Sequence, residues 1–213
     1  MKLGLVMAAL LAAGTIATAH AGTIFSTFGP GQTFSSGTGL TINGGSSGES
    51  IAEPFTPGSN TSVGSVALAL FGSAAMSLTL EGDAFGVPSG SGAVITASFT
   101  PNTVSAQVFT FTLPTPVAVT ARTQYWLVAQ SADTTGDSWA PAVASVTSPS
   151  AYYQSTGTTT WTSLAPANVL AFSVSTPTSA TVPEPASLPL LGTGMLLALA
   201  LGARRPKGAD RRD

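Results

Sequence analysis

Ionisable side chains are scarce in this 213-residue chain, and their types limit the chemistry it can perform. There is no cysteine, the one histidine is His20, and residues 22–181 contain no lysine. This central segment therefore cannot form a Ser-His-Asp triad, a Cys-His pair, a lysine Schiff base or a zinc site with histidine or cysteine ligands. Only carboxylates remain, and glycoside hydrolysis would need two of them about 5–9.5 Å apart.

The carboxylates form two close pairs in sequence, Glu49 with Glu53 and Glu81 with Asp83. Residues two apart share a face of a strand, so Glu81 and Asp83 could act together. Acidic residues near glycine are, however, common in turns. We interpret all four as exposed turn residues, and we predict that the protein is not an enzyme.

A metal ion could use the segment from Asp133 to Asp137, which contains two carboxylates and two threonines. Calcium binds carboxylate and carbonyl oxygens of loops, but this segment lacks the further acids of an EF-hand. A solvated loop would have the same residues. We therefore expect no cofactor, with calcium at Asp133 and Asp137 as the alternative.

Aromatic residues cluster towards the end of the central segment. Four of the six Trp and Tyr residues lie between positions 139 and 161, namely Trp139, Tyr152, Tyr153 and Trp161. Such rings have an apolar face and a polar edge, so they could form a sugar-stacking platform for an exopolysaccharide. The competing interpretation is that these large side chains fill the core.

The elements that would position these residues are short strands. Runs of β-favouring residues alternate with Gly, Pro, Ser, Asn and Thr, and no helical period is convincing. We predict an all-β, jelly-roll-like β-sandwich over residues 22–175, with a loop or irregular strand pair over 35–50. The predicted strands are Thr23–Phe28, Ser65–Leu70, Ser77–Glu81, Val94–Phe99, Val108–Thr112, Val117–Thr120, Gln124–Ala129, Ala151–Gln154 and Val169–Ser175.

Two of these strands have informative patterns. The alternation in Val108–Thr112 predicts Phe109 and Phe111 on one face and hydroxyl groups on the other. The segment Tyr125–Ala129 is apolar throughout, which indicates a central strand that is covered on both sides.

Charge is distributed unevenly along the chain. Residues 22–181 contain one cation, Arg122, and six carboxylates, which gives a net charge of −5 against −2 for the whole chain. Binding to nucleic acid requires cations that neutralise phosphates. We therefore predict that this protein does not bind nucleic acid.

Residues 1–21 have the pattern of a secretory signal peptide. Lys2 is followed by an apolar stretch, and Ala19-His20-Ala21 is a small-x-small site for signal peptidase. The apolar stretch is shorter than the ~20 residues of a membrane span. We expect cleavage before Gly22 and export of the mature chain.

The C-terminal end has the pattern of a membrane anchor. A linker over 176–185 ends in Pro183-Glu184-Pro185, and an apolar stretch over 186–203 follows. As a helix, this stretch would be about 27 Å long, close to the ~30 Å hydrocarbon core. Arg204 and Arg205 begin a basic tail over 204–213, which the positive-inside rule assigns to the cytoplasm.

This combination resembles the PEP-CTERM sorting signal of Gram-negative bacteria. The resemblance covers about residues 182–207 and rests on the Pro-Glu-Pro motif, the apolar span and the arginine cluster. It implies an inner-membrane stage, recognition by an exosortase, cleavage near the motif, and release or transfer of the body to the cell surface. A plain anchor after a proline-rich linker is the alternative.

The body also resembles the choice-of-anchor R domain. The resemblance would cover residues 23–175 and rests on Phe28-Gly29-Pro30-Gly31, Phe55-Thr56-Pro57, Gly86-Val87-Pro88 and the segment Thr123–Val128. The sequence departs from that family's pattern after Gly31. The resemblance implies a secreted, jelly-roll-like sandwich without an established activity. The expected function is therefore that of a non-enzymatic surface or matrix protein, and the alternative is a carbohydrate-binding module for exopolysaccharide.

Overall fold

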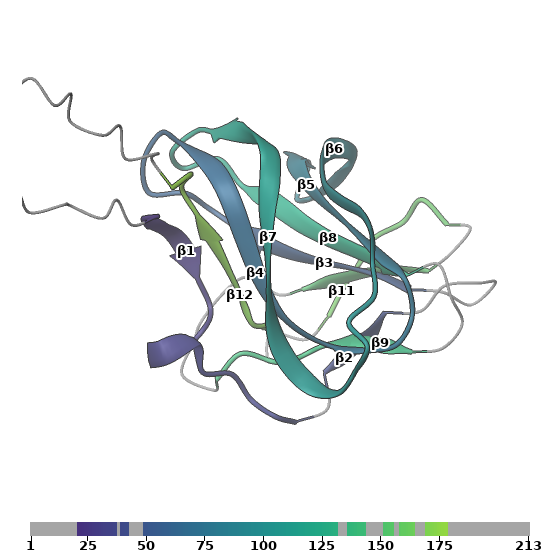
Figure 1. The fold of residues 1–213 in the computed structure, drawn as a ribbon. Coiled ribbons are helices and arrows are strands. Elements are labelled where there is room, and N and C mark those ends of the chain that lie inside the picture. Colours follow the sequence, from purple (N-terminus) through teal and green to yellow (C-terminus); the bar gives the residue numbers. More distant parts are fainter. Residues whose placement is uncertain are drawn as a thin grey trace, which may run out of the picture. The chain divides into compact units, whose positions relative to one another are not determined.

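Two antiparallel β-sheets form the described part of the chain (Figure 1). The computed structural model describes residues 21–37, 39–42, 49–131, 136–143, 151–155, 158–164 and 169–178. By its contacts the chain divides into two units, and the unit His20–Thr178 holds all of these residues. The described residues form one short helical turn, η1 (Pro30–Gln32), beside the strands. The all-β prediction and the two-sheet sandwich are thus confirmed.

The first sheet contains the two ends of the described chain. Its strands are β1 (Thr23–Ser26), β2 (Leu40–Ile42), β4 (Thr61–Gly72), β7 (Thr103–Val119), β9 (Asp137–Trp139) and β12 (Phe172–Ser175). They follow the order β1-β12-β4-β9-β2, and β7 pairs with β4. At the edge the backbone amide of Thr176 donates to the Gly22 carbonyl at 2.8 Å, so the two ends of the body meet.

The second sheet packs against the first. Its strands are β3 (Glu49–Phe55), β5 (Met76–Ala84), β6 (Val87–Phe99), β8 (Tyr125–Ser131), β10 (Tyr152–Ser155) and β11 (Thr162–Ser163). Their order is β11-β10-β3-β8-β5-β6. Strand β8 pairs with β3 on one edge and β5 on the other, and Trp126 to Ala129 are buried. The predicted central position of this strand is therefore confirmed.

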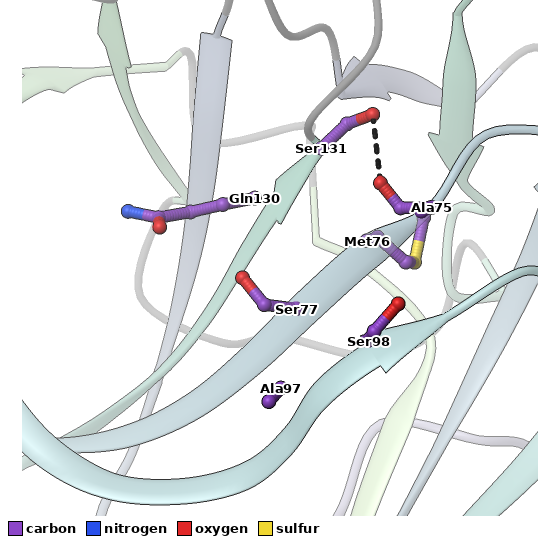
Figure 2. A pocket seen from close by; sticks show the side chains of 7 residues that line it. All are labelled: Ala75, Met76, Ser77, Ala97, Ser98, Gln130 and Ser131. Carbon is purple, nitrogen blue, oxygen red and sulfur yellow. Dashed lines mark hydrogen bonds between the residues drawn. The ribbon is translucent and has the colours of Figure 1, made fainter.

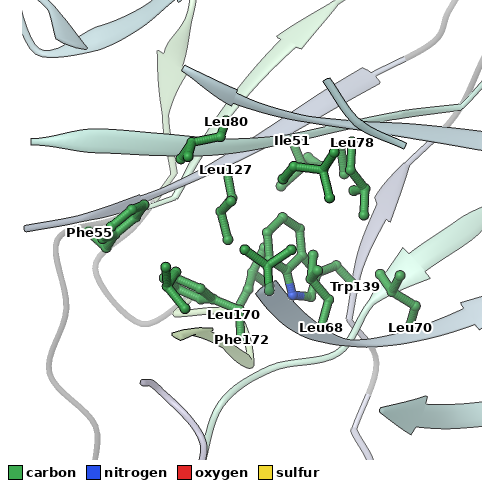
Figure 3. Packing of buried hydrophobic residues seen from close by; sticks show 14 of the residues in the cluster. Ile51, Phe55, Leu68, Leu70, Leu78, Leu80, Leu127, Trp139, Leu170 and Phe172 are labelled. Atoms are coloured by element: carbon green, nitrogen blue, oxygen red, sulfur yellow. The ribbon is translucent and has the colours of Figure 1, made fainter. Parts of the chain in front are cut away.

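The hydrophobic core lies between the two sheets (Figure 3). Leu68 and Phe172 of the first sheet lie in one cluster with Ile51 and Leu127 of the second. Trp139 is fully buried among them, and its indole nitrogen donates to the Ala171 carbonyl at 2.9 Å. Because this core lies within one unit, we expect the body to fold without the terminal segments.

Most predicted strands are present, with different ends. The runs Val108–Thr112 and Val117–Thr120 fall in one strand, β7, apart from Thr120, which follows its end. This strand continues through two prolines because it is an edge strand of the first sheet. Phe109 and Phe111 both contact Phe99, with ring centroids 4.9 and 4.8 Å away, which confirms the predicted alternation. Strands β2, β3, β9 and β11 were not predicted, and part of the expected loop over 35–50 is strand.

The predicted membrane anchor over 186–203 lies outside the described residues. Within the ranges that the structure describes, no helix is long and apolar enough to cross a membrane.

Candidate functional site

A cleft of about 380 Å³ lies on the second sheet. One wall comes from the β5–β6 hairpin and the other from the chain around β10 and β11. Its lining consists of Glu81, Val87–Gly90, Gln130, Gln154, Thr159 and Trp161. This volume lies within the roughly 300–1,000 Å³ range of ligand pockets, and polar groups meet an aromatic ring there.

The polar groups of the cleft follow from the alternation of the strands. Leu78 and Leu80 point into the core. Thr79, which lies between them, therefore points outward, and Glu81, two residues further along the strand, lies on the same outer face. Glu81 pairs with Trp126 on β8, and Ser77 pairs with Gln130, which places Gln130 on the same face. The two neighbouring strands β5 and β8 thus bring oxygen and nitrogen atoms to one surface.

Glu81 holds the hairpin wall in place. Its Oε2 accepts a hydrogen bond from the Gly90 amide at 2.7 Å, and its Oε1 accepts one from the Thr79 hydroxyl at 3.0 Å. Gly90 has a φ of +74°, a conformation that favours glycine and turns its amide towards the carboxylate. Glu81 as a whole residue is 7% exposed, and it lines the cleft.

Asp83 joins the same hairpin to β8. Its Oδ1 accepts hydrogen bonds from Trp126 Nε1 at 2.9 Å and Gln124 Nε2 at 3.0 Å. Its Oδ2 accepts one from the Gly86 amide at 3.0 Å. The Trp126 ring in turn meets Tyr152 of β10 edge to face, with centroids 5.1 Å apart. Trp126 therefore contacts residues of both walls.

The apolar side of the cleft rests on a second, smaller hydrophobic cluster. Ala52, Trp126 and Val128 are buried there, on the face opposite the main core, with Tyr152 and Trp161 packed against them. Trp161 is half-buried, so part of its ring remains accessible. The cluster thus supports an aromatic surface on the outside of the sandwich.

Figure 2 shows the residues that line a neighbouring hollow of about 270 Å³. One of them, Gln130, also lines the cleft. Ser77 and Ser98 also line the hollow, and the Ser131 hydroxyl donates to the Ala75 carbonyl at 3.3 Å. In Figure 2 the Gln130 amide extends away from Ser131. The two hollows therefore lie next to each other, with Gln130 between them.

The structure divides the predicted aromatic platform. Tyr152 and Trp161 lie in the outer cluster, as a platform requires. The prediction of Trp139 as a stacking residue is wrong, because its ring is fully buried in the main core. Tyr153 also packs on the main core, because it alternates with Tyr152 across β10.

The interpretation of the carboxylates as exposed turn residues is wrong, because Glu53 and Glu81 are buried and Glu49 and Asp83 also lie in strands, at the start of β3 and in β5. Glu53 lies in β3, fully buried, and its Oε1 accepts a long 3.4 Å hydrogen bond from the Leu170 amide. Among the described residues its Oε2 has no hydrogen-bond partner. Burial raises the pKa of this carboxyl well above its usual range, and the Leu170 hydrogen bond only partly offsets this.

Of the two residues in the calcium alternative, Asp133 lies outside the described residues. Asp137 begins β9 and is fully buried, where it accepts hydrogen bonds from the Ala74 amide at 3.0 Å and the Ser131 hydroxyl at 3.3 Å. It thereby joins the β4–β5 turn to β8. The described ranges contain no group of three or more potential metal-ligating side chains, and calcium binding stays a prediction.

The sequence did not predict that Glu81, Gln130 and Gln154 line one cleft with Trp161. Alternation within Tyr125–Ser131 could have placed Gln130 outside, but no local pattern indicates which distant strands lie beside it.

The remaining predicted sites lie in the terminal segments. Ala19, the sorting motif Pro183–Pro185, Arg204 and Arg205 are outside the described residues, whereas Ala21 and Gly22 directly precede β1. In comparisons with known proteins, no family model, no curated sequence and no solved structure matches this chain.

Proposed function

We propose that this protein is an exported, non-enzymatic surface or matrix protein that an exosortase sorts through its C-terminal segment. The observation that carries this proposal is the order of the signals, with a signal peptide before the body and the Pro-Glu-Pro motif, apolar span and arginines after it. The compact unit ends at Thr178, five residues before Pro183, so the motif follows the body directly.

The proposal includes a membrane-bound stage and a jelly-roll-like body. Residues 186–203 would hold the chain in the inner membrane after signal peptidase has acted, until cleavage delivers the body to the cell surface. A jelly roll is supported by the pairing of strands that are distant in sequence, such as β1 with β12 and β3 with β8 and β10.

The roles of the carboxylates support a non-enzymatic body. Glu81 and Asp83 both accept backbone amides of their own hairpin, and Glu53 lies in the core. These contacts explain the positions of the three side chains without a catalytic role.

The sorting proposal can be tested with Glu184→Ala and with deletion of residues 204–207 in the source bacterium. We expect both variants to stay unprocessed in the membrane fraction, as judged by their size and by fractionation. Ser179→Ala, in the same linker but outside the motif, is the matched control and should be processed. Normal processing of both test variants would refute the proposal.

A second candidate function, carbohydrate binding, is favoured by the cleft. Trp161 offers a partly exposed ring beside Glu81, Gln130 and Gln154, and sugars likewise combine an apolar face with hydroxyl groups. An exported domain would meet exopolysaccharide at the cell surface.

A further inference from the structure

We infer that the cleft on the second sheet binds an uncharged glycan, with Trp161 as the stacking ring and Glu81 as an acceptor for sugar hydroxyls. This inference rests on carbohydrate binding as the second candidate function, and it adds the site and the class of sugar. Four properties of the described residues carry it.

The first property is the acceptor capacity of Glu81. A carboxylate has about four lone-pair positions, and the hydrogen bonds from Thr79 and Gly90 occupy one on each oxygen. Glu81 lines the cleft and keeps some exposed surface, so we expect its remaining lone pairs to accept hydrogen bonds from hydroxyl groups of a ligand. Hydrogen bonds to a charged group are stronger than those between neutral groups, which makes Glu81 the main polar contact.

The second property is the aromatic ring opposite this carboxylate. Trp161 packs on the outer cluster of Ala52, Trp126 and Val128 and is only half-buried. The accessible part of the ring can therefore cover the apolar face of a pyranose. The other two tryptophans are at most 1% exposed, so Trp161 is the accessible indole.

The third property is the charge of the site. Among the residues that the structure describes, Glu81 is the one ionisable group that lines the cleft, and Arg122, in the turn between β7 and β8, is the sole cation. A uronate or sulfate would lose water without gaining a cationic partner, which is unfavourable. The cleft therefore discriminates against acidic polysaccharides.

The fourth property is that the walls are fixed before a ligand arrives. Trp126 donates to Asp83 of the hairpin and contacts Tyr152 of β10, so it acts as a positioning residue for both sides. A fixed cleft loses little conformational entropy on binding. The adjacent hollow beyond Gln130 lets a longer chain continue along the sheet.

We would test this with the purified body, residues 22–178, on neutral dextran, mannan and galactan and on acidic alginate and hyaluronate. We expect binding to at least one neutral polysaccharide and to neither acidic one, at low and at high salt. Trp161→Ala and Glu81→Gln should each weaken binding about tenfold or more. Two matched controls should bind normally. Phe85→Ala changes a fully exposed ring outside the cleft, and Glu49→Gln changes a carboxylate on the face of β3 that is turned away from the cleft.

A measurement on the unmutated body covers the case in which a variant fails to fold. N-bromosuccinimide should oxidise Trp161 first, because the other two indoles are buried, and the bound neutral polysaccharide should slow this oxidation. Binding without protection, or normal binding by both cleft variants, would overturn the site but leave carbohydrate binding intact. Binding to alginate or hyaluronate through Trp161 would overturn the class of sugar, and binding to none of the five would overturn carbohydrate binding itself.

Discussion

The buried carboxyl of Glu53 makes the stability of the body depend on pH. Glu53 has no exposed surface, one of its oxygens has no partner among the described residues, and burial raises its pKa well above the ordinary value. In the folded body it therefore keeps its proton at pH values where the unfolded chain, with a pKa of about 4.3, has lost it. Folding then requires uptake of a proton.

The sign and size of the effect follow from this difference. The folded state binds more protons, so the free energy of unfolding falls as pH rises above the pKa of the unfolded chain. The contribution of Glu53 is complete at lower pH and is lost at about 1.4 kcal/mol per pH unit until the folded carboxyl itself ionises. The free energy of unfolding should therefore fall as pH rises above the pKa of the unfolded chain, and the fall ends where the buried carboxyl ionises.

The pH dependence of stability can be measured by urea unfolding of the body and of Glu53→Gln from pH 4 to 8, with tryptophan fluorescence as the signal. The amide keeps the shape of the side chain but does not titrate. The free energy of unfolding of the variant should therefore increase relative to that of the unmutated body as pH rises. Glu53→Met, which also lacks a titrating group, should show the same pH profile as Glu53→Gln. Parallel profiles for the variants and the unmutated body would refute the reasoning.

Two further predictions concern the β5–β6 hairpin. Trp126→Phe removes the indole donor to Asp83, so urea unfolding should show a loss of about 1–2 kcal/mol; unchanged stability would mean that this bond does not fix the hairpin. Phe85 occupies the turn with a φ of +59°, followed by Gly86. Phe85→Asn gives an Asn-Gly turn, which suits this backbone conformation, and it should raise the free energy of unfolding by about 1 kcal/mol in thermal unfolding. A loss of stability would show that the exposed ring contributes to folding.

The sequence predicts strands well where alternation and propensity agree. Val108–Thr112 and Tyr125–Ala129 lie in β7 and β8, with the faces that their patterns indicate. Strand β3 was not predicted because it contains two glutamates and Pro54, residues that are disfavoured in strands. Its pairing with β8 and β10 on both edges overrides this preference.

The candidate site could be predicted only in part for a similar reason. Spacing groups Trp139, Tyr152, Tyr153 and Trp161 in sequence, but only the pairing register determines which face each ring occupies. Trp139 is in a three-residue strand that pairs with β2 and β4, which turns it into the core. Glu81 and Trp161 line one cleft although they lie far apart in the chain, and no local pattern indicates that placement.

The position of β12 has a mechanical consequence. In a protein that is held by its C-terminal segment, as we propose, any pull on the surface-bound body acts first on β12. This strand is not at an edge, because it pairs with β1 on one side and β4 on the other. Two rows of backbone hydrogen bonds must therefore fail together before the strand detaches, so the body should resist tension from flow or from a growing matrix.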